Sequence, residues 1–576
     1  MSNVNPDHIG NNVMNILRVN MSRLETTLSP LPEKWIYLGG RGLSAAILNE
    51  EMPPSADPLG EDAKLVMAGG PLAGAMVPSS GRISVGGKSP LTMGIKEANG
   101  GGPAAQKLDR LGIRAVVVEG APKDQGLYVL KVSAQGITLK AADAYKSMKT
   151  YELSSKLIAE NGNKPAVIAI GPAGERKLKS AAVILTDIDG HASRAAARGG
   201  LGAVMGAKGL KAVVIDDKGC GQVPMVDGDR FKAVLKDYVK LVKSEFPANI
   251  SRIGTPIIVN PLRAIGSMPA LNFSDEELPG SDQLGGEHIE TLVKERGGKM
   301  SGCMPGCLVR CSVVFNDAAK KHVTSSFEYE TIGLMGTNLG VCDPDIVAQL
   351  DRCCDELGVD TIETGAALGV AASVGRLTFG DGQAMLDAMD QIEKGTELGI
   401  ALGNGVVSTC EALGIDRMPA YRGQAIPAHD PRICKAAGVT YMTSPMGADH
   451  TAGMTYEDSL SSEGQVKRSF ELQIACAARD SLGHCLLATP ADREGWLTAM
   501  TEMINARYGT DITVKDIKQT GNQTIRDELE FNKGTEFSST QPDMPQFVIE
   551  EALTPNRTVF DVPRDEISGI WDRLEP

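Results

Sequence analysis

Short apolar runs, each bounded by Gly, Pro or Asp, recur through the first third of the chain. Runs of roughly four to eight apolar residues between such breakers are typical of β-strands. No long helical pattern separates them before Tyr151–Asn161. We therefore predict a β-rich N-terminal domain over residues 1–217. Its clearest predicted strands are Lys64–Ala68, Ala115–Glu119, Leu127–Val132, Ala166–Ile170 and Lys211–Ile215.

From Arg230 the pattern becomes helical, with apolar residues at spacings of three and four. Asp343-Pro344 is a typical helix start, because Asp caps free N–H groups and Pro suits the first turn. Gly358 is a typical helix end. The whole chain is thus predicted to have an α+β fold, with two largely helical domains, 218–420 and 421–576, after the β-rich one. Further helices are predicted near Thr361–Val374, Ala384–Lys394, Gly405–Leu413, Gln465–Ala478 and Arg493–Tyr508.

Glycine is abundant and aromatic residues are scarce: 65 of 576 residues are Gly, whereas Phe, Trp and Tyr together make up 4%. The net charge of −14 argues against nucleic acid as a partner, because phosphate backbones repel an acidic chain. No apolar stretch is long enough to predict membrane insertion. The polar segment Met1–Asn12 carries no export signal, and the 11 cysteines are an odd number. We therefore expect a cytoplasmic protein with reduced thiols.

Three cysteines lie within nine residues in the segment Cys303-Met-Pro-Gly-Cys307-Leu-Val-Arg-Cys311. Iron–sulfur clusters need thiolates that converge from a tightly folded chain, which the Pro-Gly pair permits. A four-iron cluster needs a fourth ligand, and we favour Cys485 because it lies in a polar turn. A zinc site is the alternative, although zinc loops more often place two residues between ligands. The other candidates for the fourth ligand are Cys220, Cys342, Cys353, Cys354, Cys410, Cys434 and Cys476.

Several glycine-rich turns, most with basic residues, lie in the predicted N-terminal domain. Bare backbone N–H groups and guanidinium groups suit a phosphate-bearing cofactor. Two familiar nucleotide motifs fail: Gly87-Lys-Ser89 has Arg82 where a P-loop needs its first Gly, and Gly200–Gly206 is spaced wrongly for a dinucleotide fingerprint. One such turn would be an ordinary loop, but four favour a large polar cofactor. The turns are Gly39-Gly-Arg-Gly-Leu43, Gly81-Arg-Ile-Ser-Val-Gly-Gly-Lys88, Asn99-Gly-Gly-Gly102 and Arg194-Ala-Ala-Ala-Arg-Gly-Gly-Leu-Gly202.

The form D-x-L-G occurs twice, in Asp355-Glu-Leu-Gly-Val-Asp360 and in Asp480-Ser-Leu-Gly-His-Cys485. Taken alone, this repeat is explained by two helices that each end at a Gly. Together with the cysteine segment and the glycine-rich turns, however, it resembles the aldehyde ferredoxin oxidoreductase family, the tungsten or molybdenum bis-pyranopterin enzymes. The resemblance runs from about Asn15 to about Tyr508. Its other markers are Asn15-Ile-Leu-Arg-Val-Asn20, Gly87-Lys-Ser-Pro-Leu-Thr92 and Gly447-Ala-Asp-His-Thr451.

The resemblance implies that the N-terminal sheet domain forms the base for two pterins, whose dithiolenes hold the metal without a protein ligand. Asp355 and Asp480 would accept hydrogen bonds from the pterin rings. The backbone carbonyls of Asn99 and Ala195 would hold a Mg²⁺ that bridges the pterin phosphates, and Arg82 would lie between one pterin and the cluster. The implied cofactor-binding residues are Arg82, Asn99, Gly101, Ala195, Arg198, Asp355, Asp360, Asp480 and Gly483.

The same resemblance implies a [4Fe–4S] cluster and a catalytic pair. Glu330 aligns with the family's acidic active-site residue, and His450 aligns with its active-site His. In aldehyde oxidation a carboxylate can take a proton from water, while a His can hydrogen-bond the carbonyl oxygen. Without the resemblance, these two residues would be a surface carboxylate and a loop His. The implied cluster ligands are Cys303, Cys307, Cys311 and Cys485.

The sequence departs from the family pattern in three places. Three residues, rather than the usual two, separate Cys303 from Cys307. Ala452 stands where some members have Lys, which removes a pterin contact. In one branch an E-x-x-H pair binds a metal across a dimer, but here the positions read Gln349-Leu-Asp-Arg352. That metal is therefore not expected, and either a homodimer or a hetero-oligomer remains open.

The resemblance predicts oxidation of a small aldehyde to the acid, with electrons passing through the cluster to ferredoxin or an iron–sulfur subunit. A second hypothesis is a specialised member, the catalytic subunit of a larger complex, which acts on an acyl thioester or carboxylic acid in the reductive direction. A third is a cofactor-binding subunit without turnover. The presence of both Glu330 and His450 argues against this third hypothesis.

Overall fold

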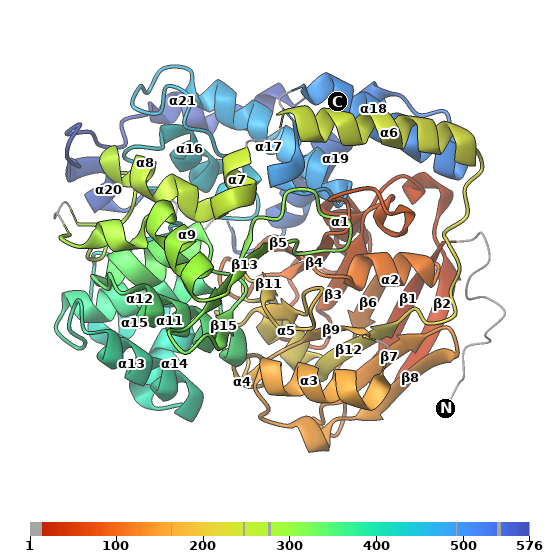
Figure 1. Cartoon of the computed structure of the whole chain (residues 1–576), viewed down its shortest axis with the longest axis horizontal. Helices are drawn as coiled ribbons and strands as arrows, with labels where there is room; N and C mark the ends of the chain where they lie inside the picture. The colour runs from red at the N-terminus through yellow and green to blue at the C-terminus, as the bar shows by residue number, and fades with distance from the viewer. Residues whose placement is uncertain are drawn as a thin grey trace.

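The computed structural model describes residues 14–162, 164–245, 248–274, 278–490, 492–537 and 543–574. The segment Met1–Asn12, on which the expectation about export rests, lies outside the described residues. Figure 1 shows the N-terminal sheets, in red to yellow, beside a helical region in green and cyan. The predicted α+β fold, with a β-rich N-terminal domain followed by largely helical regions, is confirmed.

The first sheet has six strands in the order β2-β1-β6-β3-β4-β5. The pair β1 and β6 is parallel, whereas the other neighbours are antiparallel. Tight turns can join antiparallel strands. Of the glycine-rich segments predicted as turns, Asn99–Gly102 lies at the end of strand β5, whereas Gly81–Lys88 is largely strand β4 and Gly39–Leu43 begins a helix. The strands are β1 (Asn15–Asn20), β2 (Glu25–Pro30), β3 (Lys64–Gly69), β4 (Ile83–Lys88), β5 (Ile95–Gly100) and β6 (Ile113–Glu119).

The second sheet also has six strands, in the order β11-β10-β9-β12-β7-β8. Here β7 and β12 form the parallel pair. The strands are β7 (Tyr128–Ser133), β8 (Gly136–Ala141), β9 (Ala166–Ala169), β10 (Val183–Leu185), β11 (Arg194–Ala196) and β12 (Leu210–Asp216). All five strands predicted from apolar runs are therefore present, within a few residues of the predicted ends.

One apolar core joins the two sheets, because Leu65 of the first sheet and Val213 of the second belong to the same buried cluster. Two short helices, α2 (Ala104–Arg110) and α5 (Leu201–Ala207), complete this core. The sequence did not predict the longer helix α1 (Gly40–Glu51). Its residues 40–48 are all buried, so it lacks the polar face that makes a helix recognisable.

The helical regions begin with α6 (Gly228–Glu245). The helix start predicted at Asp343-Pro344 is confirmed, because the Asp343 side chain caps α11 (Pro344–Leu357), and this helix ends at Gly358 as predicted. A three-stranded sheet of β13 (Lys299–Ser301), β14 (Ser312–Asn316) and β15 (His322–Thr324) was not predicted. The other helices are α3 (Thr150–Asn161) and α4 (Pro172–Glu175) in the N-terminal domain, then α7 (Ala248–Ile253), α8 (Val259–Ala264), α9 (Gly286–Glu295), α10 (Tyr329–Thr331), α12 (Thr361–Ser373), α13 (Gly382–Lys394), α14 (Glu397–Gly403), α15 (Val406–Leu413), α16 (Lys435–Thr443), α17 (Gln465–Ser481), α18 (Arg493–Tyr508), α19 (Val514–Lys533), α20 (Gln546–Glu550) and α21 (Arg564–Ser568).

Helix α6 packs against α18, far along the chain, as Figure 1 shows at the top of the molecule. Phe231 and Tyr238 of α6 share a buried cluster with Trp496 and Met500 of α18. The segment after residue 217 therefore contacts the C-terminal region directly. The domain boundaries at 217 and 420 stay predictions.

A buried ion pair fastens the C-terminal region to the N-terminal domain. Arg41 of α1 donates two hydrogen bonds of 2.7 Å to Glu528 of α19, and both side chains are almost fully buried. The buried face of α19 contains polar residues such as Thr524 and Glu528, which hid this helix from the apolar pattern. Among the described residues, the helices are too short or too polar to cross a membrane.

Candidate active site

Four of the cysteines converge in one buried cluster of side chains. Cys303, Cys307 and Cys311 lie in the loop from β13 to β14, and Cys485 follows α17. The thiol of Cys303 contacts Cys307, and this hydrogen bond is the main reason why the pKa of Cys307 falls to about 6. The remaining cysteines do not belong to this cluster. The structure thus brings together the three clustered cysteines and the favoured fourth one.

The cysteine loop rests on the glycine-rich turn after β5. A Cβ added to Gly101 would lie only 2.8 Å from Cys303 Sγ, so any side chain there would displace the loop. The N–H of Gly102 donates to the carbonyl of Cys303 at 2.9 Å. Gly306, with φ at 76°, adopts the left-handed conformation in the Cys303–Cys307 stretch. The extra residue in this stretch is therefore accommodated by a tight turn.

The two D-x-L-G segments are helix ends, as the repeat alone suggested. Gly358 ends α11 with φ at 70°, and Gly483 follows α17 with φ at 64°. Both turns are seated in the same way on the N-terminal domain. A Cβ on Gly171, after β9, would lie 2.2 Å from the carbonyl oxygen of Leu357, and one on Gly70, after β3, would lie 2.0 Å from that of Leu482. Each sheet thus presents one glycine to one turn.

Replacing Gly70 with Ala should destabilise the protein by about 1–3 kcal/mol, because the new methyl group collides with backbone and cannot be absorbed by a flexible side chain. Urea unfolding should show a lower midpoint than for the wild type. Gly221→Ala is the matched control, since nothing lies within 4 Å of a Cβ there. Equal midpoints for the two variants would contradict this account of how the turn is seated.

The first turn carries two buried carboxyl groups; Asp360 accepts a hydrogen bond from the N–H of Ile362 at 3.0 Å, whereas Asp355 has few donors. Asp355 accepts a hydrogen bond from the hydroxyl of Ser326 at 3.3 Å. Burial, reinforced by the nearby Asp351, raises the pKa of Asp355 well above its usual range. Burial also raises the pKa of Asp360, although Arg198 Nε lies 3.4 Å from its Oδ2. A ligand with N–H donors would stabilise such groups as carboxylates.

The second turn is held by arginines. Asp480 Oδ1 accepts a hydrogen bond from Arg479 Nη2 at 2.9 Å, and Arg41 Nη1 lies 3.8 Å from Asp480 Oδ2. The backbone N–H of Arg82 donates to the carbonyl of Gly483 at 3.1 Å. The Asp480 carboxylate is therefore already paired with arginines, unlike the carboxyl group of Asp355 in the first turn.

Arg82 also connects the second turn to the cysteine cluster. Burial raises the pKa of the Cys485 thiol, and the positive charge of Arg82 opposes that rise. The Arg82 guanidinium donates to the carbonyl of Asn99 at 2.7 Å. Asn99 and Ala195 lie on strands of different sheets that approach each other, since a Cβ on Gly100 would be 3.5 Å from the carbonyl carbon of Ala195. The two carbonyls predicted to share a Mg²⁺ thus lie in adjoining segments.

Glu330 and His450, far apart in sequence, meet in the interior. Glu330 Oε2 accepts a hydrogen bond from the N–H of Ala428 at 2.8 Å. Its Oε1 lies 3.4 Å from His450 Nε2 and 2.9 Å from Nε2 of a second imidazole, His429. Burial acts to raise the pKa of Glu330, but the two imidazoles and this N–H outweigh it and lower the pKa to about 2. Burial lowers the pKa of His450. The carboxylate is therefore ionised, and His450 neutral, near neutral pH.

A buried ion pair supports the loop of His450. Lys96 Nζ of β5 lies 2.5 Å from Asp449 Oδ2, and neither side chain is appreciably exposed. Arg198 donates from its guanidinium to the carbonyl of Ala448. Cations of the N-terminal domain thus hold the loop of His450 in place. Sequence patterns missed Lys96, Asp449 and His429, and only the small number of His residues, 7 in the chain, could have drawn attention to His429.

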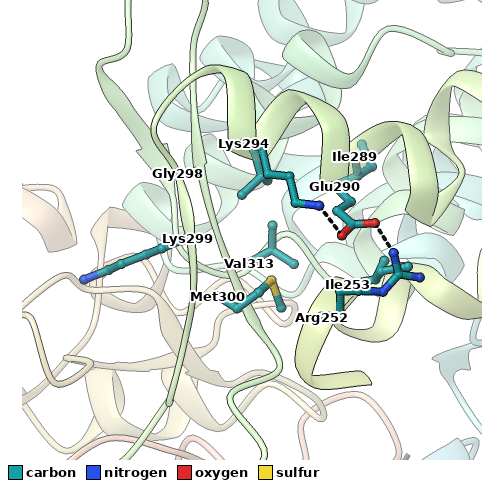
Figure 2. A pocket seen from close by; sticks show the side chains of 10 residues that line it. Arg252, Ile253, Ile289, Glu290, Lys294, Gly298, Lys299, Met300 and Val313 are labelled. Carbon is teal, nitrogen blue, oxygen red and sulfur yellow. Dashed lines mark hydrogen bonds and ion pairs between the residues drawn. The ribbon is translucent and has the colours of Figure 1, made fainter. Parts of the chain in front are cut away.

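A separate pocket of about 160 Å³ lies between α7, α9 and the β13–β14 pair, as Figure 2 shows. Glu290 bridges Arg252 at 2.5 Å and Lys294 at 2.6 Å across its mouth. Lys299 and Met300, which also line it, belong to the strand that leads into the cysteine loop. None of the candidate catalytic or cofactor-binding residues lines this pocket, so it is distinct from the candidate active site.

Comparison with known proteins places the chain in one family over most of its length. Residues 16–217 match the family described as aldehyde ferredoxin oxidoreductase, N-terminal domain, and residues 233–566 match aldehyde ferredoxin oxidoreductase, domains 2 and 3. The tungsten-containing aldehyde ferredoxin oxidoreductase of Pyrococcus furiosus is 31% identical, covering 94% of this chain and 92% of the relative. The enzyme of that name from Thermococcus kodakarensis is 30% identical with the same coverage.

Two more distant similarities extend the comparison. A protein of Pyrococcus furiosus named aliphatic sulfonate oxidoreductase, WOR-like subunit, is 28% identical over 72% of this chain and 71% of its own length. The solved active-site complex BamBC of benzoyl coenzyme A reductase, with 1,5-dienoyl-CoA, shares the fold at a TM-score of 0.79. It is 16% identical and covers 97% of this chain and 93% of the other. From the two family matches and the near full-length relatives, the chain belongs to the aldehyde ferredoxin oxidoreductase family of oxidoreductases.

Proposed function

We propose that the protein oxidises an aldehyde to a carboxylic acid at a tungsten or molybdenum bis-pyranopterin. Water supplies the oxygen, and two electrons leave through a [4Fe–4S] cluster to ferredoxin or an iron–sulfur subunit. The observation that carries the proposal is the meeting of Glu330 and His450 in the interior. These residues lie 120 positions apart in the sequence, and Glu330 Oε1 lies 3.4 Å from His450 Nε2.

The residues at the two turns fit a polar cofactor. Arg41 Nη1, Glu97 Oε1 and Arg194 Nε are buried polar atoms without a hydrogen-bond partner among the described residues. Leaving such groups unpaired is costly, so each calls for a ligand atom. Arg41 and Glu97 act electrostatically on the second turn through Asp480, and Arg194 acts on Asp355 of the first. Two pterins would need polar partners in the protein. Within the described part of the chain, the second turn offers an unpaired donor and an unpaired acceptor, and the first turn offers an unpaired donor.

The sulfur and magnesium sites fit their proposed ions in chemistry. Four thiols, three of them buried and that of Cys307 partly buried, form the usual ligand set of a [4Fe–4S] cluster, which would supply a one-electron path out of the protein when bound. Mg²⁺ prefers oxygen ligands, and a carbonyl oxygen that already accepts one hydrogen bond retains a second lone pair. Asn99 and Ala195 would therefore hold Mg²⁺ through their backbone carbonyls, and the ion would neutralise phosphate charge there.

The chain's own groups have separate tasks in the proposed reaction. The bound metal centre supplies the two-electron oxidation, in which aldehyde and water give acid, two protons and two electrons. Glu330, ionised near neutral pH, orients the water and takes its proton at Oε1 as the new C–O bond forms. His450, neutral at the same pH, donates a hydrogen bond to the aldehyde oxygen.

The test is metal analysis and an assay on anaerobically purified protein. We expect tungsten or molybdenum, about four iron atoms per chain, and aldehyde-dependent reduction of an electron-accepting dye. Protein that carries neither metal nor iron after anaerobic purification would contradict the proposal.

A second candidate function is reduction of an acyl thioester or carboxylic acid, with this chain as catalytic subunit of a larger complex. The 28% identical relative bears the word subunit in its name, which favours such an assembly. Assays with an acyl thioester and a low-potential electron donor separate the two functions.

Arg310 lies beside the four cysteines, since its backbone N–H donates to Cys307 Sγ at 3.4 Å. An acidic electron-transfer partner would be attracted by the positive charge of Arg310 at this place. We place the activity in the cytoplasm.

A further inference from the structure

Glu330 has a closer imidazole neighbour than its expected partner. His429 Nε2 lies 2.9 Å from Glu330 Oε1, against 3.4 Å for His450 Nε2. The His429 side chain is 2% exposed, whereas that of His450 is 15% exposed. The ligand-type atoms of all three residues lie within 4.8 Å of one another. His429 is thus the more firmly enclosed of the two imidazoles.

The other face of His429 is held by a tyrosine. The hydroxyl of Tyr456 lies 2.5 Å from His429 Nδ1. A carboxylate can only accept a hydrogen bond, so an N–H of His429 that faces Glu330 must be on Nε2. Donation from the Tyr456 hydroxyl to Nδ1 would keep that N–H on Nε2, and Tyr456 would then orient the ring. His450 has no such support, because its Nδ1 lacks a partner among the described residues.

We propose that His429 is a positioning residue of the active site, which Tyr456 orients so that it holds Glu330 in place as a carboxylate and leaves His450 free for the substrate. The inference rests on the proposed function for its catalytic meaning. Its structural part, the control of Glu330 by His429, can be measured without turnover.

The surroundings of Glu330 contain few other charges. Arg198 acts on it from the β11–α5 connection, and the two imidazoles act from the loops at 429 and 450. The remaining titratable groups that interact with it are neutral near pH 7: Tyr329, Tyr441, Tyr456 and Cys434. Without His429, burial would act on Glu330 with only His450, Arg198 and one backbone N–H against it. The pKa of Glu330 should then rise.

Three variants of the full-length protein test the proposal. His429→Phe keeps a ring of similar size but removes the donor, and the pKa of Glu330 should rise by about one unit or more. His429→Gln can place an amide N–H near the position of Nε2, and should restore most of the wild-type behaviour. Tyr456→Phe removes the hydroxyl that orients the His429 ring and should give an intermediate rise in the pKa of Glu330. Thr451→Ser, an exposed change beside His450, serves as control.

Two readouts are needed. Difference infrared spectra, with Glu330→Gln identifying the band, report protonation of this carboxyl group directly. At about pH 3, one unit above the wild-type pKa of about 2, the wild type should show at most a weak band, whereas His429→Phe should show a clearly stronger one. In the holoenzyme, the acidic limb of kcat/KM should move to higher pH in the same order of variants.

An ionised Glu330 at the same acidic pH in His429→Phe and in the wild type would overturn the proposal. The proposal would also be overturned if all three variants, His429→Gln included, had a lowered activity but an unchanged pH dependence of kcat/KM. That result would mean that His429 has a structural role only. An infrared shift in protein that oxidises no aldehyde would retain the positioning role and reject the proposed function instead.

Discussion

Replacing Cys485 with Ser should abolish binding of the proposed iron–sulfur cluster while leaving the fold intact. Cys485 is buried beside Cys303, Cys307 and Cys311, and it is the one thiol of this cluster that comes from outside the β13–β14 loop. An alcohol is a poor ligand compared with a thiolate, so three ligands would remain for four irons. We expect the brown absorbance near about 400 nm, typical of thiolate-ligated clusters, to be lost together with most of the iron.

The matched control is Cys410→Ser, a buried cysteine of α15 that lies in the helical core rather than in the cysteine cluster. It should retain iron and colour. Circular dichroism of both variants establishes whether they fold. If Cys485→Ser kept its iron and absorbance, the fourth ligand would have to be another residue.

Replacing Glu330 with Gln should leave metal and cluster in place but reduce turnover by at least about 100-fold, the usual contribution of a proton-transferring group. Gln has the same shape and can still accept from the N–H of Ala428. It cannot take a proton from water. Because the pKa of Glu330 is about 2, the wild type should lose no activity through protonation of this group near neutral pH.

Glu328→Gln is the control, since Glu328 lies two positions earlier and accepts a hydrogen bond from the hydroxyl of Thr255 at 2.7 Å. Its kcat should stay close to the wild-type value. Full activity of Glu330→Gln, measured with unchanged metal and iron content, would remove Glu330 from the proposed mechanism.

Local sequence patterns were most reliable for short apolar runs bounded by Gly, Pro or Asp and for helices with a distinctive cap. The buried strands β6 and β12 are examples of the first, and helix α11, with Asp343 before it and Gly358 after it, is an example of the second. The patterns missed α1, whose residues 40–48 are all buried, and α19, whose buried face mixes apolar and polar residues. The buried Arg41–Glu528 pair joins these two helices, and such a tertiary contact leaves no local pattern.

Some residues of the candidate site were visible in the sequence, and others were found only in the structure. Cysteine spacing and the repeated D-x-L-G form were visible in the sequence, and the resemblance to a family connected them to Glu330 and His450. The ligand roles of these residues stay predictions, although the structure brings the four cysteines together. His429 carried no pattern at all. It lies in a loop, and its importance follows only from its 2.9 Å approach to Glu330.

By itself the sequence determined the α+β fold class, the order of the main elements and membership of an oxidoreductase family. These depend on local periodicity and on motifs of fixed spacing. Only the tertiary structure decided which glycines seat the two turns, which cations fix the loop of His450, and which imidazole lies closest to Glu330. The physical reason is that close approach, burial and charge pairing join residues hundreds of positions apart, and no local pattern records such distances.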